Sequence, residues 1–254
     1  MTQQNKIALV TGGSRGLGKN MALKIADKGL DVLLTYHSKK EEAEAVAETI
    51  RSKGQKAAVL QLDTANSTAF PAFVEQTQQE LKQHFGTGKI DYLVNNAGIG
   101  INAPFVETTE EQFDLLMNIH LKGVFFLTQQ LLPMLNDGGG IINVSSGLAR
   151  FALPGYAAYG ALKAAVETLT RYQAKELGSR GIRSNVIAPG AIETDFNGGA
   201  VRDNEQYNQI VASFTALGRV GLPDDIGGVV AFLCTDDARW INAQRIEVSG
   251  GQSI

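Results

Sequence analysis

Short apolar runs alternate with longer amphipathic stretches along the whole 254-residue chain, and this alternation limits the folds that it can adopt. The apolar runs predict strands at residues 7–10, 31–36, 57–62, 90–94, 140–144, 183–187 and 245–248. Helical spacing predicts helices at residues 17–28, 39–53, 68–84, 110–135, 156–179 and 224–233. Strands that alternate with helices form parallel sheets with helices on both faces. The sequence therefore predicts an α/β fold, a doubly wound parallel sheet of about seven strands.

One domain, residues 1–254, is the simplest division of the chain, because no linker, repeat or low-complexity tract interrupts the alternation. Residues 192–220 are the exception, since they are rich in glycine, asparagine and other polar residues and follow a predicted strand end. Ligands bind open α/β sheets at the carboxyl ends of the strands. We therefore expect residues 192–220 to form a mobile lid over a substrate. An inert surface excursion is the alternative.

Composition argues against several classes of function. Hydrophobic residues make up 44% of the chain, enough for a large core, and a net charge of −3 gives no basic surface for nucleic acid. No apolar run is long enough to span a bilayer, and the first ten residues lack the apolar stretch of a signal peptide. The single cysteine, Cys234, lies in an apolar run, and the three histidines are too scattered for a metal cluster. We expect a cytoplasmic protein without a metal, with Cys234 in its core.

A glycine loop, residues 11–18, reads Thr-Gly-Gly-Ser-Arg-Gly-Leu-Gly and follows the first predicted strand. Glycines there permit a tight turn and let the backbone approach a pyrophosphate, which faces the N-terminus of the next helix. A glycine trio alone is weak evidence. Its position after the first strand of a repeating β/α chain predicts a dinucleotide site.

The end of the second predicted strand indicates which dinucleotide binds. NAD sites usually have a carboxylate at this position to hold the ribose 2′-hydroxyl, but here the residue is Tyr36, which would not repel a 2′-phosphate. Arg15, His37, Ser38 or Lys39 could bind that phosphate. One charge-assisted contact is worth about 1.5–3 kcal/mol, a preference of roughly tenfold or more. The sequence therefore predicts NADP(H), although Lys39 alone would more simply start a solvated helix.

Tyr159 and Lys163 are four residues apart and so share one face of a predicted helix, and Ser146 precedes them. A free tyrosine has a pKa of about 10, which a nearby ammonium and a cationic nicotinamide would lower. Ser146 could hold a substrate oxygen while Tyr159 donates or accepts a proton. This is the chemistry of carbonyl–alcohol interconversion.

These motifs together resemble the short-chain dehydrogenase/reductase family. The glycine loop, Asn95-Asn96-Ala97-Gly98, Ser146 with Tyr159-x-x-x-Lys163, and Pro189-Gly190 occur in the family's order, and the resemblance runs from Lys6 to about Gly251. It implies a single-domain Rossmann fold, often assembled as a tetramer through the helices at 110–135 and 156–179 and the C-terminal segment. It also implies that Ser146 binds the carbonyl, that Tyr159 is the general acid in reduction, and that Lys163 lowers the tyrosine pKa and holds the nicotinamide ribose.

The same resemblance places further residues against the cofactor. Asp63 would meet the adenine ring, the segment around Asn95 would pass the adenine ribose, and the segment that follows Pro189 would orient the nicotinamide amide. For Asn95 the alternative is a structural role at the end of a strand. The full set of predicted cofactor contacts is Gly12, Ser14, Arg15, Gly16, Leu17, Gly18, Tyr36, His37, Ser38, Lys39, Asp63, Asn95, Ala97, Gly98, Tyr159, Lys163, Pro189, Gly190, Ile192 and Thr194.

His120 departs from the family pattern. Members of the family usually carry an asparagine here, which helps to hold a water that relays protons from the lysine. If that relay uses the main-chain carbonyl, His120 serves equally well. If it uses the side chain, the relay is altered or the imidazole itself titrates. The remaining alternative is a histidine that only fills space.

The predicted activity is NADPH-dependent reduction of a ketone, 3-ketoester or 3-oxoacyl substrate by a homotetramer or homodimer. Residues 136–139, Asn-Asp-Gly-Gly, are expected to form an acidic turn before the fifth strand, where reductases of carrier-bound substrates often have basic residues. The alternatives are an NAD-dependent alcohol dehydrogenase and a cofactor-binding regulatory protein without catalysis. A Ser-His-Asp hydrolase lacks support, because its Gly-x-Ser-x-Gly turn is absent.

Overall fold

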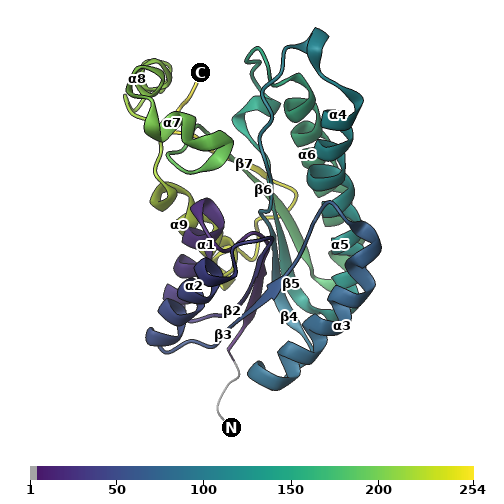
Figure 1. Ribbon diagram of the computed structural model, residues 1–254. Coiled ribbons are helices and arrows are strands. Elements are labelled where there is room, and N and C mark those ends of the chain that lie inside the picture. Colours follow the sequence, from purple (N-terminus) through teal and green to yellow (C-terminus); the bar gives the residue numbers. More distant parts are fainter. Residues whose placement is uncertain (1–4) are drawn as a thin grey trace.

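The computed structural model describes residues 5–254, which form a parallel seven-stranded sheet between two layers of helices (Figure 1). The strand order is β3-β2-β1-β4-β5-β6-β7, the order of a doubly wound fold. The predicted fold class is confirmed. The strands are β1 (Ile7–Val10), β2 (Asp31–Tyr36), β3 (Ala57–Gln61), β4 (Ile90–Asn95), β5 (Leu135–Val144), β6 (Arg183–Pro189) and β7 (Arg245–Val248).

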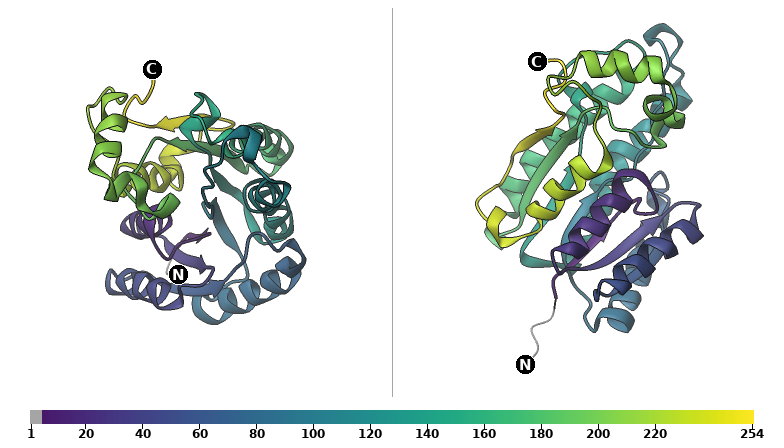
Figure 2. Two further views of the ribbon diagram at one scale, coloured as in Figure 1. Left: turned by 45° about the horizontal axis from the view of Figure 1, so that its top comes forward. Right: turned by 90° about the vertical axis from the view of Figure 1, so that its left-hand side faces the viewer.

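Helices cover both faces of the sheet (Figures 1 and 2). One layer contains α1 (Gly16–Asp27), α2 (Lys40–Ser52) and α9 (Pro223–Leu233). The other contains α3 (Phe70–Glu80), α4 (Glu110–Met117), α5 (Gly123–Leu131) and α6 (Ala157–Leu177). Two short helices, α7 (Ala200–Asp203) and α8 (Glu205–Ser213), lie beyond the sheet at the top of Figure 1. The shorter turns are η1 (Ser67–Ala69), η2 (Leu81–Phe85), η3 (Phe105–Glu107), η4 (Asn118–Lys122), η5 (Leu132–Met134), η6 (Gly147–Ala149), η7 (Gly178–Arg180), η8 (Phe196–Gly199) and η9 (Asp236–Ala238).

Two hydrophobic cores hold the layers together, one on each face of the sheet. Alternate residues of β1 serve both, because successive side chains of a strand point to opposite faces. Ala8 and Val10 pack in the core beneath α1, α2 and α9, whereas Ile7 and Leu9 pack in the core beneath α3 and α5. Burial of one such large apolar side chain contributes about 1.5–3 kcal/mol. This packing fixes the carboxyl ends of the strands, where the predicted site lies.

The prediction of an acidic turn at residues 136–139 is wrong, because these residues belong to β5. Gly138 has a left-handed φ of +77°, and the pairing of β5 with β4 is irregular nearby. A Cβ on Gly139 would lie 2.3 Å from the Asp91 carbonyl oxygen, so the strands approach closely there. The segment is at the beginning of β5, opposite the carboxyl ends of the strands, and therefore carries no information about substrate docking at those ends.

The long helix predicted at 110–135 is divided by the π turn η4. The predicted lid contains α7 and α8. Val211 in α8 is buried and helps to anchor the lid to the rest of the protein. The structure thus gives the lid more regular structure than its polar composition indicates. That it moves stays a prediction.

Other expectations concern the whole chain. Cys234 is fully buried, as predicted, and burial raises the pKa of its thiol to about 12. No helix within residues 5–254 combines the length and apolar character needed to cross a membrane. Nor does that part of the chain group three or more His, Cys, Asp or Glu side chains where a metal ion could be held. Residues 1–4, part of the stretch judged to lack a signal peptide, lie outside the described residues.

Candidate functional site

The sheet brings the predicted site residues to one edge, because all its strands are parallel. Val10 at the end of β1 pairs with Leu34 in β2 and with Val94 in β4, so the loops that follow these strands are neighbours. The glycine loop follows β1, Tyr36 ends β2, and Asn95 ends β4. Ser146 comes just after β5 and Gly190 just after β6. The predicted cofactor and chemical residues therefore share this edge.

The glycine loop is fixed by the strands on either side of it. Gly12 donates its N–H to Thr35 Oγ1 at 3.1 Å, and Asn96 Nδ2 donates to the carbonyl oxygen of Thr11 at 2.9 Å. Gly12 and Gly16 have left-handed φ values of +66° and +54°. A Cβ on Gly18 would lie 2.1 Å from the Gly12 carbonyl oxygen. Glycine is thus required here for both turn geometry and close packing.

The first turn of α1 suits an anionic group. Its N-cap, Arg15, makes no side-chain hydrogen bond to the helix, and no acidic residue lies in the first turn. The free N–H groups and the positive end of the helix dipole therefore face the glycine loop. Half-buried Ser14 and Leu17 line the same turn. These features fit the pyrophosphate of a dinucleotide.

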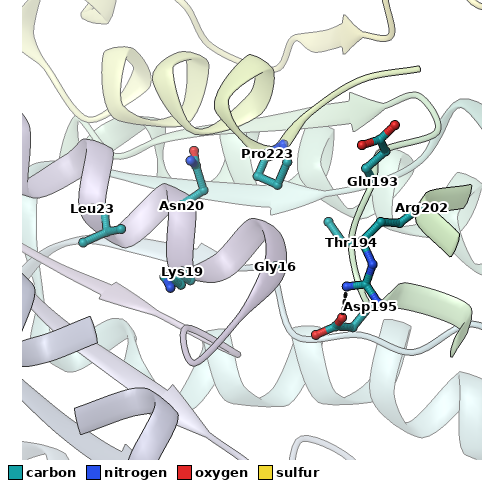
Figure 3. A pocket seen from close by; sticks show the side chains of 9 residues that line it. All are labelled: Gly16, Lys19, Asn20, Leu23, Glu193, Thr194, Asp195, Arg202 and Pro223. Carbon is teal, nitrogen blue, oxygen red and sulfur yellow. Dashed lines mark hydrogen bonds and ion pairs between the residues drawn. The ribbon is translucent and has the colours of Figure 1, made fainter. Parts of the chain in front are cut away.

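A cavity of about 290 Å³ separates α1 from the lid (Figure 3). Arg15 Nη1 lies 3.7 Å from Asp195 Oδ2 across this gap, and Arg202 forms a closer ion pair with the same carboxylate. Arg15 and Asp195 are roughly half exposed, so the attraction between them is weak. The cavity is lined by Gly16, Lys19, Asn20, Leu23, Glu193, Thr194, Asp195, Arg202 and Pro223. Sequence reasoning missed the pairing of Arg15 with Asp195, because no local pattern links residues so far apart.

Most of the residues predicted to contact the adenosine part of the cofactor are exposed. Tyr36 is half-buried, and His37, Ser38 and Lys39 are exposed. The Lys39 ammonium lies 3.8 Å from Glu42, a weak surface pair. Asp63 is also exposed, and its Oδ1 accepts the Ala65 N–H at 2.9 Å.

Asn95 is built into the sheet rather than open to a ligand. Its side chain donates to Thr128 Oγ1 at 3.0 Å and to Asn143 Oδ1 at 2.9 Å. Asn143 in turn donates to Thr170 Oγ1, so the buried network joins β4 and β5 to α5 and α6. These contacts favour the structural alternative for Asn95. Ala97 and exposed Gly98 follow on the cofactor edge, where the Ala97 N–H donates to Thr11 Oγ1.

The segment after β6 closes the site from the other side. Pro189 is buried, and the Gly190 N–H donates to the carbonyl oxygen of Val248. Ile192 pairs with Gly221, which joins the two ends of the lid. Thr194 is 9% exposed and its Oγ1 accepts the Phe196 N–H at 3.2 Å.

Ser146, Tyr159 and Lys163 come together at the N-terminal part of α6. Ser146 hydrogen-bonds the Tyr159 hydroxyl, and both Tyr159 and Lys163 are buried. Lys163 Nζ donates to the Val144 carbonyl oxygen at 2.8 Å and lies 5.5 Å from the centroid of the Tyr159 ring. Ser145 instead donates to Glu167 Oε1 at 2.7 Å, in the polar contacts behind the site. This geometry is consistent with the choice of Ser146.

Burial dominates the ionisation of this group. It raises the pKa of Tyr159 above its ordinary value of 10, although the hydrogen bond from Ser146 opposes the shift. In the protein alone, this desolvation outweighs the lowering of the Tyr159 pKa expected from Lys163 and a bound cationic nicotinamide, and the Lys163 ammonium is directed to a carbonyl oxygen. Burial also lowers the pKa of Lys163 to about 7. A protonated phenol is the form that a general acid requires.

His120 is buried beside Tyr159, in the π turn η4. Its Nε2 lies 2.8 Å from the Ile99 carbonyl oxygen and 3.4 Å from the Ile99 backbone nitrogen. The shorter contact, to the oxygen, assigns the hydrogen to Nε2 and leaves Nδ1 as an acceptor. Nδ1 has no hydrogen-bond partner among the described residues. Burial and the charge of Lys163 lower the pKa of His120 well below 6.5. Both effects favour the neutral form of the imidazole.

Two aromatic residues at Tyr159 were missed from the sequence. The Tyr156 ring lies 6.4 Å from it and the Phe196 ring, from the lid, lies 6.0 Å from it. Tyr156 precedes Tyr159 by one helical turn, so its spacing was a usable signal. Phe196 gave no such signal, because its contact depends on how the lid folds.

Comparison with known proteins finds relatives that match nearly the whole chain. The model of a family described as enoyl-(acyl carrier protein) reductase matches residues 12–253. The hydroxynaphthalene reductase-like protein Arp2 of Metarhizium brunneum is 38% identical over 257 residues, which cover 97% of this chain and 94% of that protein. The 3-oxoacyl-[acyl-carrier-protein] reductase FabG of Staphylococcus aureus is 37% identical over 251 residues, or 98% of both chains. The crystal structure of the angucycline C-6 ketoreductase LanV with bound NADP superposes with a TM-score of 0.93, at 37% identity, over 98% of this chain and 95% of that one.

Proposed function

The chain belongs to the short-chain dehydrogenase/reductase family, and from that premise we propose that it uses NADPH to reduce a ketone to the corresponding alcohol. The observation that carries this proposal is the grouping of half-buried Ser146 with buried Tyr159 and Lys163, at the same edge of the sheet as a glycine loop that fits a dinucleotide. Relatives named for keto reduction support it, because they align with nearly the whole chain.

NADPH, when bound, supplies the hydride. Ser146 holds the carbonyl oxygen through its hydroxyl, and Tyr159 donates its phenolic proton to that oxygen as the alcohol forms. The raised pKa of Tyr159 keeps this proton in place at neutral pH before reaction. Lys163 lies over the face of the ring and, in its ammonium form, stabilises the phenolate that remains. Burial of these groups excludes water and strengthens each electrostatic contact.

The cofactor residues are assigned by the same logic. The glycine loop and the N-terminus of α1 would hold the pyrophosphate. Arg15, next to the loop, would bind the 2′-phosphate, since Tyr36 leaves no carboxylate at the end of β2 to repel it. LanV, a similar structure, contains NADP. An NAD-dependent alcohol dehydrogenase is the second candidate, but no residue at the end of β2 favours it.

His120 is proposed to support the catalytic group by packing against Tyr159 and fixing the Ile99 loop. We further propose a homo-oligomer, because large apolar side chains of α4 and α5, in one of the two segments expected to form the interface, are partly exposed: Phe113, Leu115, Phe125 and Phe126. We propose more specifically that the oligomer is a homotetramer. We also propose that the protein is cytoplasmic.

The test is consumption of NADPH and, in parallel, NADH by the purified protein with a panel of ketones, 3-ketoesters and 3-oxoacyl thioesters. We expect NADPH-dependent turnover with formation of one alcohol per NADPH consumed. Faster turnover with NADH would favour the dehydrogenase alternative. Cofactor binding without turnover on any carbonyl would contradict the proposed function.

A further inference from the structure

Three aromatic rings surround the proposed proton donor. The imidazole of His120 meets the Tyr159 ring edge-on at 5.2 Å, with an interplanar angle of 87°. Tyr156 also meets it edge-on, and Phe196 lies tilted against it. We call these residues, His120, Tyr156, Tyr159 and Phe196, the aromatic enclosure. Because they come from η4, α6 and the lid, the enclosure exists only in the folded protein.

Phe196 is the part of the enclosure that comes from the predicted lid. Its side chain is 44% exposed, and its Cε1 would lie 2.8 Å from a Cβ on Gly100, so the ring is pressed against the backbone there. The next residues, Asn197, Gly198 and Gly199, all have left-handed φ values. Such a run holds the lid in a sharp bend, and Asn197 Nδ2 attaches it to Tyr156 Oη at 2.7 Å. This segment therefore packs directly against the ring of Tyr159.

A ketone can react only if its oxygen reaches the hydroxyl groups of Tyr159 and Ser146. The body of the molecule must then lie against the aromatic enclosure, where Phe196 now packs. Edge-to-face and tilted ring contacts are favourable beyond the area that they bury, whereas a saturated chain gains only the area. We propose, on the basis of the proposed function, that the preferred substrate is a flat, fused-ring aromatic ketone whose ring packs with Phe196 against Tyr159.

The polar groups of the enclosure fit such a substrate. The Asn197 amide donates to Tyr156 Oη at 2.7 Å, and the remaining hydrogen-bonding capacity of this pair could be used by hydroxyl groups on an aromatic ring. The charges on the lid do not favour a substrate attached to an acidic carrier protein. Asp195 and Asp203 are themselves acidic, and the one arginine beside them, Arg202, already forms ion pairs with both. A neutral, flat ring with hydroxyl substituents is compatible with all these groups.

The test compares 2-tetralone with 2-decalone, which share one bicyclic carbon skeleton but differ in aromaticity. With NADPH, we expect kcat/KM for 2-tetralone to exceed that for 2-decalone by about two- to tenfold, the size of aromatic pair contacts. The acyl thioester S-acetoacetyl-N-acetylcysteamine should be poorer than 2-tetralone. Equal or faster turnover of 2-decalone or of the thioester overturns the inference but leaves the proposed function standing. If none of these three compounds and no member of the wider carbonyl panel is reduced, both the inference and the proposed function are overturned.

Phe196→Leu shows whether the preference comes from the lid ring. Leucine keeps an apolar side chain but removes the ring, so the ratio of kcat/KM for 2-tetralone to that for 2-decalone should fall to about one. The matched control is Phe232→Leu in α9, where a ring of similar exposure, 38%, lies outside the lid. That variant should keep the wild-type ratio. An unchanged ratio in Phe196→Leu, with a raised KM for NADPH, would show that Phe196 faces the cofactor and would overturn the inference.

Discussion

Tyr159 and Lys163, at the chemical end of the site, are only 7% and 5% exposed, whereas the side chains of Arg15 and Lys39, at the cofactor end, are both 55% exposed. Core packing and hydrogen bonds hold the first pair in place. The second pair forms only weak surface ion pairs, with Asp195 and Glu42. The chemical groups are therefore positioned before any ligand arrives, and the groups proposed to select the cofactor are free to change partners.

The difference shows which parts of the site depend on backbone geometry and which depend on side chains. Close packing leaves buried side chains few alternative positions. Exposed arginine and lysine side chains keep their rotamer freedom and lose it only when a ligand orders them. The glycine loop belongs with the chemical end in this respect, because its shape is set by backbone contacts to β2 and β4. Changes in the rigid parts should thus have larger effects than changes in the exposed ones.

Gly18→Ala should give the largest effect on the cofactor end. The new Cβ would meet the Gly12 carbonyl oxygen at 2.1 Å, so the loop must shift. We expect a loss of about 1–3 kcal/mol in the free energy of unfolding, as for overpacked sites, and weaker NADPH binding. Denaturant unfolding and calorimetric titration measure the two quantities. Gly228→Ala in α9 is the control, because nothing lies within 4 Å of its Cβ position; equal losses in both variants would refute the rigid loop.

Arg15→Ala should have a smaller and selective effect. Removal of a charge-assisted contact to a 2′-phosphate should weaken NADPH binding by about tenfold, while NADH binding changes little. Equilibrium titration with both cofactors measures this. Lys39→Ala offers a comparison at the same end with equal exposure. Equal losses for NADPH and NADH in Arg15→Ala would remove its role in 2′-phosphate recognition.

His120→Asn should change the pH dependence of stability. The pKa of His120 is lowered in the folded protein, so below about pH 6.5 the unfolded chain binds a proton that the folded chain does not. Stability is therefore lost as the pH falls through this window. We expect the free energy of unfolding to be lower at about pH 5.5 than at neutral pH, and the asparagine variant should lack this loss. Denaturant unfolding at both pH values measures the difference; the same acid loss in the variant would contradict a buried, neutral imidazole.

Much of the fold followed from the sequence, because local periodicity and the alternation of elements determine it. The predicted bounds of β1, β2 and β7 match the structure. The π turn η4 and the early start of β5 were not predictable, since both depend on tertiary contacts, such as the close approach of Gly139 to Asp91. The lid helices were missed because their polar composition is typical of a loop.

The candidate site divides in the same way. Ser146, Tyr159 and Lys163 could be found from spacing, because one helix face and one strand end carry them. The contact of Phe196 with Tyr159 and the pairing of Arg15 with Asp195 join segments far apart in the chain and leave no local pattern. The raised pKa of Tyr159 in the protein alone was also not predicted, since the extent of burial is a property of the assembled core.

The most direct test of the account is Tyr159→Phe, with NADPH binding and the rate of a single turnover measured on the same preparation. Phenylalanine keeps the ring contacts to His120, Tyr156 and Phe196 but removes the proton donor. We expect NADPH affinity to stay within about twofold and the rate of ketone reduction to fall by about 100-fold or more. Reduction at close to the wild-type rate would contradict the proposal that Tyr159 is the general acid of a prebuilt catalytic group.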